Sequence, residues 1–544
     1  MKRFSHFERS QIIQTMQDDV FDLCIIGGGI NGAGVARDAV SRGMKVALIE
    51  AHDFASGTSS RSSKLIHGGI RYLENMEFHL VFEALNERTR LFEMAPHLVH
   101  PLRFMIPLYE NSRVGMFKMG LGMWLYDALA LFQAPEMHER LNAEESMSRM
   151  PALAPKDLRG SYIYSDAYMD DDRLVHETMR SAVEMGAVCA NFVKATGAGF
   201  NSQGKIEAVE CEDQLSQKKF RIRAKHVVSC VGPWTDDLGE KIFRDWKSIL
   251  RPTKGIHLTL QKSRLPLTSA VVMAAERSDR IVFGIPRHEM VLIGTTDTDY
   301  RELPDGVVAT AEDVKYLLEI TRQYFPGAAI TEKDIVATYA GVRPLVKDQS
   351  SSEGKTSREH VIIDDARGLT LVAGGKYTTY RLMSEQVVSH SLKFFSFDER
   401  VRFSKSDTTK ALNAYADVNS FNQSLAMTSI WARETGRPES DIQKLAERYG
   451  MEAAEILHFY PAHYNYWQLE AAQSIDHTLC LNLTDFYARR VPLFLAELQH
   501  GMPQLESICQ VFREKLSWSD SEMQKQKEAL RAYMDRELAW KSQL

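Results

Sequence analysis

Near its start the chain alternates between short apolar runs and a helical pattern. Apolar runs cover residues 21–26 and 45–50, and the stretch from Ala33 to Arg42 between them has the spacing of a helix. A strand, a glycine turn, a helix and a second strand predict a βαβ unit, which opens a parallel sheet. Residues 51–69 are rich in Ser, Thr and Gly, which is typical of a functional loop.

Apolar runs recur along the first 400 residues. They lie at residues 224–231, 271–274, 281–285, 291–294 and 369–373. Turn residues separate the middle runs, so we expect a mostly antiparallel sheet in this part of the chain.

The pattern changes after about residue 395. Residues 406–418 are polar, and helical patterns dominate from residue 420, where Gly becomes sparse. We therefore expect four parts, which are an N-terminal extension at 1–19, an α/β domain at 20–395, a linker at 396–419 and a helical domain at 420–544. The extension is either an ordered arm or a loose tail.

The nearest candidate for a membrane-spanning segment covers residues 114–132, VGMFKMGLGMWLYDALALF. Lys118 and Asp127 interrupt this stretch and its glycines weaken it as a helix, so it is not a clean span. Two interpretations stay open, a buried helix or a helix that lies flat on a membrane. The N-terminus lacks the apolar run of a signal peptide, so we expect the chain to stay inside the cell.

Composition narrows the classes of protein. A chain of 544 residues should form two or three domains, and its formal net charge of −6 argues against a general nucleic-acid binder. The six cysteines are scattered without metal-ligand spacing, which favours small buried side chains in a reducing cytosol. No EF-hand pattern occurs in the sequence, so we predict no metal site.

A glycine cluster follows the first apolar run directly. Gly27, Gly29 and Gly32 form the pattern G-x-G-x-x-G, a helix follows, and Glu50 ends the next apolar run. This is the context that a dinucleotide-binding fingerprint requires. Gly27 permits a tight turn, Gly29 lets the backbone approach a pyrophosphate at the helix end, and Gly32 allows close helix packing. Glu50 can accept hydrogen bonds from the adenosine ribose.

The fingerprint does not distinguish NAD from FAD, but two later segments do. Residues 227–234, VVSCVGPW, are a strand that ends in Gly-Pro, and residues 369–380, LTLVAGGKYTTY, are a strand, a glycine pair and a helix start. In two-domain flavoproteins the chain returns to the cofactor at such strand ends, so we predict FAD. The helix that starts near Tyr377 can present N–H groups to the flavin pyrimidine ring, where negative charge develops on reduction.

Three sequence blocks together resemble the family of bacterial FAD-dependent, aerobic-type glycerol-3-phosphate dehydrogenases. They are IIGGGINGAGVARDA at 25–39, GTSSRSSKLIHGGIRYLE at 57–74, and the pair TYAGVRPL at 338–345 with GGKYTTYR at 374–381. The resemblance covers residues 20–390 well and the helical tail more loosely. It implies a Rossmann-like two-domain FAD-dependent oxidoreductase of the α/β class, with a mixed-sheet substrate domain and a C-terminal helical domain. FAD-binding segments would be 20–100, 160–250 and 335–395, and substrate-domain segments 101–159 and 251–334.

The resemblance also implies noncovalent FAD and a set of cofactor contacts. A serine-rich loop matches the family's loop beside the flavin and pyrophosphate, and Val193 matches a backbone contact to adenine. The expected FAD contacts are Gly27, Gly29, Asn31, Gly32, Glu50, Thr58, Ser59, Ser60, Ser63, Val193, Gly232, Gly375, Lys376 and Thr378.

A phosphorylated substrate requires fixed cations, and Arg matches phosphate oxygens best because its planar fork can donate two hydrogen bonds. Arg71, Arg343 and Lys376 each stand next to or near glycine in blocks that should face the flavin, and Arg381 is a weaker candidate. The alternative for each is a surface cation or an ion pair with a carboxylate. Tyr72 and Thr379 can add hydrogen bonds to the substrate.

The implied reaction moves a hydride from the substrate C2 to the flavin while a base takes the hydroxyl proton. A base that titrates near neutrality points to His, and His257 in KGIHLTL and His67 in KLIHGG are the candidates. A structural histidine is the alternative reading for both. Arg343 can also lower the pKa of the substrate hydroxyl, so Arg343 and Lys376 join the expected catalytic set.

The resemblance implies oxidation of sn-glycerol 3-phosphate to dihydroxyacetone phosphate, with reoxidation of FAD by membrane quinone. It also implies a cytoplasmic protein in peripheral contact with the inner membrane surface, and it allows a homodimer. Three alternatives stay open. They are an oxidase that uses oxygen, an amine or amino-acid oxidase of the same broad fold, and a flavin-binding regulator without turnover.

Overall fold

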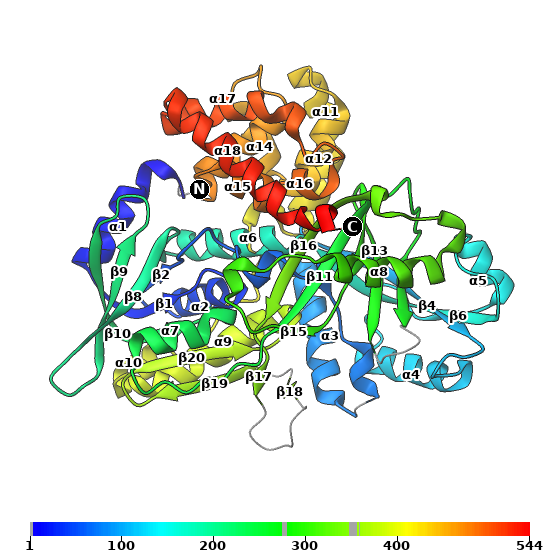
Figure 1. Cartoon of the computed structure of the whole chain (residues 1–544). Coiled ribbons are helices and arrows are strands. Elements are labelled where there is room, and N and C mark those ends of the chain that lie inside the picture. Colours follow the sequence, from blue (N-terminus) through cyan, green and yellow to red (C-terminus); the bar gives the residue numbers. More distant parts are fainter. Residues whose placement is uncertain (1–3, 75, 275–279, 348–355, 358–359, 544) are drawn as a thin grey trace.

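The protein, seen here as a computed structural model, has two α/β halves that lie side by side under a helical region (Figure 1). The structure describes residues 4–74, 76–274, 280–347, 356–357 and 360–543. The helices of the two halves are α1 Arg9–Asp18, α2 Ile30–Ser41, α3 Phe78–Met94, α4 Met116–Leu129, α5 Ala143–Arg149, α6 Asp171–Glu184, α7 Thr235–Ile242, α8 Ala311–Tyr324, α9 Tyr380–Ser391 and α10 Phe397–Arg402.

The first sheet has a parallel core, as the βαβ pattern predicts. Its strands are β1 Val20–Ile26, β2 Val46–Ile49, β7 Val188–Ala190, β8 Val193–Phe200, β9 Ile206–Asp213, β10 Lys219–Ser229, β19 His360–Asp365 and β20 Leu369–Gly374. They run in the order β19-β20-β10-β1-β2-β7, with parallel pairing from β20 to β7. The α/β class with a Rossmann-like sheet is thereby confirmed.

Side chains of β1 alternate between two covered faces of this sheet. Leu23 and Ile25 pack in the cluster that includes α2, α6 and α9, whereas Cys24 and Ile26 pack in the cluster on the other side, with Met16 of α1. Because both faces are covered, the strand is apolar throughout instead of alternating with polar residues. The parallel strands end together at one edge, and the glycine turn after β1 lies there.

The second sheet is mostly antiparallel, as predicted. Its strands are β3 Leu65–Ile66, β4 Val99–Tyr109, β5 Glu139–Asn142, β6 Leu158–Met169, β11 Thr253–Gln261, β12 Ala270–Ala274, β13 Ile281–Arg287, β14 Met290–Gly294, β15 Thr298–Asp299 and β16 Ile335–Arg343. A separate ribbon pairs β17 Val346–Lys347 with β18 Thr356–Ser357. By hydrogen bonding, β3 and β16 belong to the second sheet, although both fall in segments expected to bind FAD. The division into segments therefore stays a prediction.

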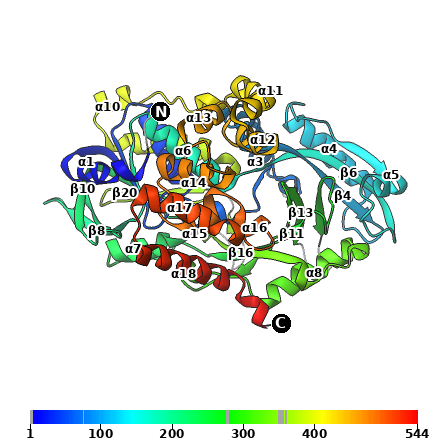
Figure 2. The same ribbon diagram turned by 90° about the horizontal axis from the view of Figure 1, so that it is seen from above.

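The helical region begins with α11, and Figure 2 shows it lying over the junction of the two halves. Its helices are α11 Val418–Thr435, α12 Glu439–Tyr449, α13 Glu452–Phe459, α14 Tyr466–His477, α15 Leu483–Asp485, α16 Leu493–Ala496, α17 Leu505–Leu516 and α18 Asp520–Glu537. Buried ion pairs attach the region to the first half. Arg489 and Arg490 both bind Asp53 at 2.9 and 2.7 Å, and Arg180 binds Glu452 at 2.8 Å.

The described part of the N-terminal extension, residues 4–19, is an ordered arm. Phe4 and Met16 are buried, and Arg9 of α1 binds Asp213 at 2.7 Å and the carbonyl of Asn191 at 2.9 Å. The polar segment expected to be a linker also packs on the first half, because Arg37 of α2 donates hydrogen bonds to its carbonyl groups at Thr408 and Lys410.

The apolar stretch at 114–132 forms α4 and the turn after it. Its inner face buries Met123 and Tyr126, whereas Phe117, Leu121 and Trp124 are exposed to 82%, 59% and 59%. A fully buried helix is therefore the wrong interpretation of this stretch. In the part of the chain that the structure describes, no helix is long and apolar enough to cross a membrane.

Candidate active site

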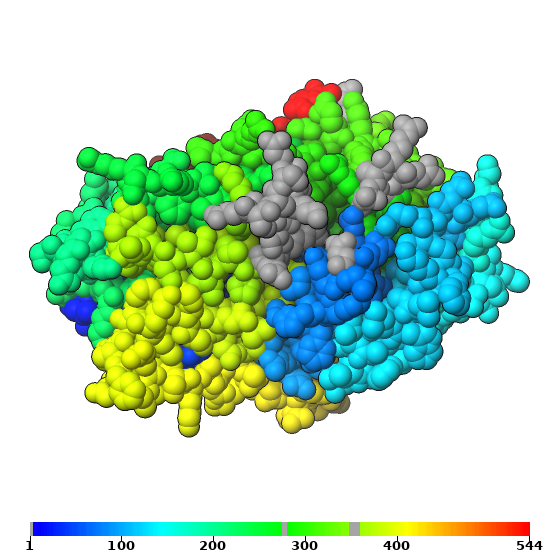
Figure 3. Space-filling model, turned by 90° about the horizontal axis from the view of Figure 1, so that it is seen from below, coloured from blue at the N-terminus to red at the C-terminus, as the bar shows by residue number. Residues whose placement is uncertain are grey.

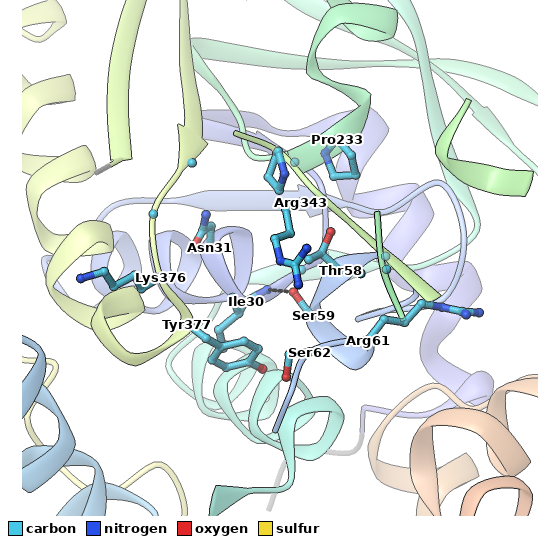
Figure 4. Close-up of a pocket in the computed structure, with 18 of the residues that line it drawn as sticks. Ile30, Asn31, Thr58, Ser59, Arg61, Ser62, Pro233, Arg343, Lys376 and Tyr377 are labelled. Atoms are coloured by element: carbon cyan, nitrogen blue, oxygen red, sulfur yellow. Dashed lines mark hydrogen bonds between the residues drawn. The ribbon is translucent and has the colours of Figure 1, made fainter. Parts of the chain in front are cut away.

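A cavity of about 700 Å³ lies between the carboxyl edge of the first sheet and the inner face of the second (Figure 4). Segments far apart in the sequence line it, and six of them come from turns, loops or strand ends. They are the turn after β1, the end of β2, the loop at 56–63, the turn after β10, the end of β16 and the turn at 374–378. The first sheet supplies loops, and the second supplies side chains that point from its strands.

The glycine turn forms one wall of the cavity. Gly27 has a φ of +108°, and a Cβ there would lie 2.6 Å from the carbonyl oxygen of Cys230. A Cβ on Gly32 would lie 1.9 Å from the carbonyl oxygen of Gly27, so both positions require glycine. The N-terminus of α2 follows at once, and the Ile30 N–H donates to Ser59 Oγ at 3.0 Å. Backbone N–H groups at such a helix end suit a pyrophosphate.

Glu50 stands at the end of β2, as the fingerprint requires. Its carboxylate accepts hydrogen bonds from the backbone N–H groups of Gly28 at 2.6 Å and His52 at 2.9 Å. Burial raises the pKa of this carboxyl, and the two N–H donors act in the opposite direction. The backbone of Val193 lies beside it, since its N–H donates to the Glu50 carbonyl at 2.8 Å. The Glu50 carboxylate suits a ribose hydroxyl, and the backbone of Val193 suits an adenine ring.

These residues fit FAD. Glycine lets the turn pack closely against the chain at Cys230, which brings the N-terminus of α2 to the cavity, and Glu50 offers the ribose acceptor. A second helical N-terminus, the 3₁₀ turn Tyr377–Thr379 that leads into α9, borders the same cavity. One continuous cavity therefore contains a ribose acceptor, a helix N-terminus for the pyrophosphate and a second helical N-terminus for the flavin of a dinucleotide.

A cationic group stands where β16 ends. Arg343 reaches into the cavity from this strand, and its guanidinium donates to Thr295 Oγ1 at 2.9 Å and pairs with Asp297 at 3.2 Å (Figure 4). Gly255 on the neighbouring β11 leaves room for it, because a Cβ there would lie 2.4 Å from Arg343 Nη2. Lys376 lines another side of the cavity, with its Nζ 3.7 Å from the centre of the Tyr72 ring.

The candidate base His257 projects from β11 and is buried. Its Nε2 lies 2.9 Å from Ser63 Oγ, and its ring stacks on Tyr339 at 4.9 Å with an interplanar angle of 11°. Burial and the nearby cations of Arg343 and Lys64 hold the pKa of His257 well below its usual 6.5. The imidazole is therefore neutral at neutral pH, and it is a weaker base than the histidine titrating near neutrality that the sequence predicts. Its Nδ1 has no hydrogen-bond partner among the residues that the structure describes.

The second candidate, His67, also lines the cavity and is half-buried. Its backbone N–H donates to Thr378 Oγ1 at 3.2 Å, which joins the loop before the short helix at Ile70–Leu73 to the turn before α9. Arg71 and Tyr72 of that short helix line the cavity as well.

Most of the predicted cofactor and substrate residues meet at this cavity, but four predicted positions do not. Gly32 lies behind the turn, and Ser60 and the buried Thr379 are absent from the lining. Thr379 Oγ1 faces the carbonyl of Lys376 instead. Arg381 was a mistaken candidate for phosphate binding, because it is buried with its guanidinium on Glu87 at 2.8 Å.

The sequence patterns missed several residues of the lining. Arg61 and Ser62 belong to the loop at 56–63. Thr295 follows directly after β14, and its hydroxyl oxygen accepts a hydrogen bond from Arg343. An apolar wall of Leu65, Ile70, Tyr164, Val272 and Phe283 borders the same space. The alternation of inward residues along β12 and β13 is the signal that could have found part of this wall. In the described part of the chain, no group of three or more His, Cys, Asp or Glu residues could hold a metal ion.

Known proteins are similar to this chain in sequence and in architecture. Residues 22–381 match the FAD dependent oxidoreductase family, and residues 417–523 match the C-terminal domain of alpha-glycerophosphate oxidase. An aerobic glycerol-3-phosphate dehydrogenase from a Staphylococcus aureus strain is 33% identical over 530 residues, which are 96% of this chain and 95% of that protein. One from Staphylococcus saprophyticus is 33% identical over 541 residues, or 98% and 97%.

Among solved structures, a glycerol-3-phosphate dehydrogenase from Bacillus halodurans complexed with FAD is similar along nearly the whole chain. The TM-score is 0.79 at 29% identity, and the match covers 98% of both chains. A glycine oxidase from Geobacillus kaustophilus, with a TM-score of 0.53 at 19% identity, covers 70% of this chain and 96% of its own. This second similarity shows a shared fold and no more.

Proposed function

Because the chain belongs to the FAD-dependent oxidoreductase family, in the group of aerobic glycerol-3-phosphate dehydrogenases, we propose the following roles for its residues in oxidising sn-glycerol 3-phosphate to dihydroxyacetone phosphate. FAD is the cofactor, and it supplies an acceptor for the hydride that leaves C2 of the substrate. The rest of the chemistry falls to side chains of this chain.

The observation that carries the proposal is that Arg343, a cation held in place by its neighbours, and the neutral imidazole of His257 line the same cavity. Arg343 is already oriented by Thr295 and Asp297, so its fork needs little rearrangement to bind a phosphate. Lys376 and Arg71 add positive charge on other sides. A phosphate dianion with a hydroxyl two carbons away suits this combination.

His257 is the proposed base. The His257 imidazole is neutral because burial and nearby cations lower its pKa, so one ring nitrogen carries a lone pair at neutral pH. The substrate hydroxyl proton would move to this imidazole while Arg343 stabilises the developing charge on the oxygen. His67, on the loop that contacts Thr378, is the alternative base.

The phosphate-binding cations also separate this proposal from an amine or amino-acid oxidase of the same fold. Such an enzyme would need one partner for a carboxylate and would gain nothing from a second cation, Lys376, on another side of the same cavity. An anaerobic spectrum of the purified protein tests the choice. Flavin bands that bleach promptly with glycerol 3-phosphate, and not with glycerol or amino acids, support the proposal. Bands that bleach only with an amino acid overturn it.

Quinone is the proposed electron acceptor, reached at a membrane surface. The exposed apolar face of α4, formed by Phe117, Leu121, Trp124 and Leu125, continues into Leu131 and Phe132 of the following turn. Figure 3 shows α3 and α4, in blue and cyan, side by side on the face opposite the helical region. Lys118 is exposed on the same helix and suits anionic lipid headgroups.

This arrangement supports peripheral contact with the cytoplasmic face of the inner membrane. Two electrons from each substrate would reduce a quinone, which takes up two protons to become the quinol. An oxygen-using oxidase is the alternative, and comparable rates with oxygen and a quinone analogue would favour it. A homodimer stays a prediction from the resemblance.

A further inference from the structure

The end of the helical region inserts into the α/β half that contains the second, mostly antiparallel sheet. Figures 1 and 2 both show α18 running across the junction and ending beside α8 and β16. Trp540, in the turn that follows α18, is fully buried in the core under α8. Its Nε1 donates to Thr338 Oγ1 at 2.9 Å, and the Thr338 hydroxyl donates to the Glu537 carbonyl at 2.6 Å. The last turn of α18 is therefore bonded to the strand that ends at Arg343.

The side chain of Glu537 makes a second connection, to the serine-rich loop at residues 58–63, which is the cofactor loop. It is fully buried, and its carboxylate accepts a hydrogen bond from Arg61 Nη2 at 2.9 Å. Arg61 also donates to the carbonyl of Ala340 on β16 at 3.2 Å. Figure 4 shows its side chain pointing away from the other labelled residues, although its neighbours Ser59 and Ser62 line the cavity.

The cofactor loop and β16 are also bonded to each other directly. Thr58 Oγ1 donates to the carbonyl of Val342 at 2.6 Å, and the Tyr339 hydroxyl donates to the carbonyl of Ser62 at 2.9 Å. Bonds at Thr58, Arg61 and Ser62 thus fix the loop to successive positions of the strand. Glu537, from the helical region, bonds to both the loop and the strand, because its carboxylate accepts from Arg61 and its carbonyl accepts from Thr338.

A buried carboxylate is costly unless it is paired, and removing its partner leaves a buried charge. Glu537 Oε2 has no hydrogen-bond partner in the described part of the chain, so the carboxylate is held chiefly by Arg61. The loop conformation that contacts the cofactor therefore depends on a residue 476 positions later in the sequence.

We propose that Glu537 is a positioning residue of the active site. Through Arg61 and Thr338, the last turn of α18 holds the cofactor loop at 58–63 against the strand that presents Arg343. The helical region then has a defined task, which is to set the distance between cofactor and phosphate-binding groups. This inference rests on the proposed function for the roles of Ser63 and Arg343.

The first test replaces Glu537 by Gln, which keeps the size and an acceptor oxygen but leaves the Arg61 charge unpaired. We expect FAD to leave the diluted holoprotein at least tenfold faster, as followed by flavin fluorescence. With FAD in excess, the KM for glycerol 3-phosphate should rise threefold or more, while kcat changes less. Asp535→Asn, on the exposed face of the same helix, is the matched control and should stay within twofold of the parent protein.

Two further variants keep the test decisive if E537Q folds poorly. Trp540→Phe keeps an aromatic ring but removes the N–H bond to Thr338 and part of the buried volume, and it should shift FAD release in the same direction by about threefold. Arg61→Met combined with Glu537→Gln should release FAD no faster than the worse single variant, because the two residues act as one pair.

Parental FAD release and parental KM in E537Q would overturn the proposal, even if its melting temperature fell. Release rates that multiply in the double variant would also overturn it. FAD release involves no substrate, so this readout stays valid if the wild-type protein fails to oxidise glycerol 3-phosphate. That failure would reject the proposed function alone.

Discussion

The hydroxyl of Tyr126, on the inner face of α4, lies 3.0 Å from the backbone nitrogen of Gly68 and 2.7 Å from Asp166 Oδ2. Arg88 completes this buried cluster, since its guanidinium binds the other Asp166 oxygen at 2.6 Å. Gly68 follows directly after the candidate base His67 in the cavity wall. The helix whose outer face is exposed and apolar is thus bonded, through its inner face, to the active-site loop.

Tyr126→Phe tests this connection. The change removes the hydroxyl and leaves the Gly68 N–H and one Asp166 oxygen with fewer partners. We expect the free energy of unfolding to fall by about 1–3 kcal/mol. The KM for glycerol 3-phosphate should rise severalfold, because Arg71 and Tyr72 lie on the same loop. Tyr316→Phe is the control, since the Tyr316 hydroxyl has no hydrogen-bond partner among the described residues. Equal effects of both changes would contradict the connection.

Arg343 should contribute mainly to substrate binding. Arg343→Met is expected to lower kcat/KM for glycerol 3-phosphate roughly 10- to 100-fold, equivalent to about 1.5–3 kcal/mol for a hydrogen bond to a charged group. Arg343→Lys keeps the charge but loses the fork, so its loss should be intermediate. Steady-state kinetics with an artificial dye measures both. Arg301→Met, an exposed cation outside the cavity, should have no effect, and a loss of equal size there would argue against a specific phosphate site.

His257 gives a prediction about pH. Because burial and the charges of Arg343 and Lys64 hold its pKa well below 6.5, it is already deprotonated in the neutral range. The kcat should therefore stay level between about pH 8 and about pH 6, where an ordinary histidine would become protonated. His257→Gln should reduce kcat by roughly 10²- to 10⁴-fold if this imidazole is the base. A kcat that halves near pH 6.5 in the parent protein would assign the proton transfer to another group.

Local patterns predicted the strand, glycine turn and helix that line one wall of the cavity. The turn at Gly27 and the carboxylate at Glu50 are fixed by backbone geometry and strand ends, which a short stretch of sequence encodes. The parallel and antiparallel character of the two sheets also followed from apolar runs and turn residues.

Such local patterns could not predict contacts between segments that lie far apart in the sequence. Arg61 and Glu537 are 476 positions apart, and nothing near either residue indicates the other. Arg381 looked like a phosphate ligand because it follows the glycine turn, but the buried Glu87 on α3 binds it instead. The sequence also left two interpretations of α4 open, because its apolar residues suit a protein core as well as a lipid surface.

His226 should make stability depend on pH. It is buried with its ring stacked on Phe394 at 4.2 Å, and burial lowers its pKa to about 4 from the ordinary 6.5. The unfolded chain therefore binds a proton at a higher pH than the folded one, and stability falls as the pH drops below 6.5. From neutrality to pH 5, this group alone should cost about 2 kcal/mol. Urea unfolding at both pH values should show a smaller loss for His226→Gln, whereas the exposed His79→Gln should keep the parental loss.

The exposed face of α4 predicts how the protein meets a membrane. Phe117 and Trp124 are among its most exposed apolar residues, and each would gain about 1.5–3 kcal/mol when it leaves water for lipid. Replacing both by Ser should therefore lower partition onto anionic vesicles at least tenfold in a sedimentation assay. Turnover with a soluble dye should persist, because neither side chain lines the cavity. Phe459→Ser, an equally exposed aromatic in the helical region, should bind vesicles like the parent protein. If the α4 variant also bound like the parent, the apolar face would need a protein partner instead of lipid, and the route to quinone would have to start elsewhere on the surface.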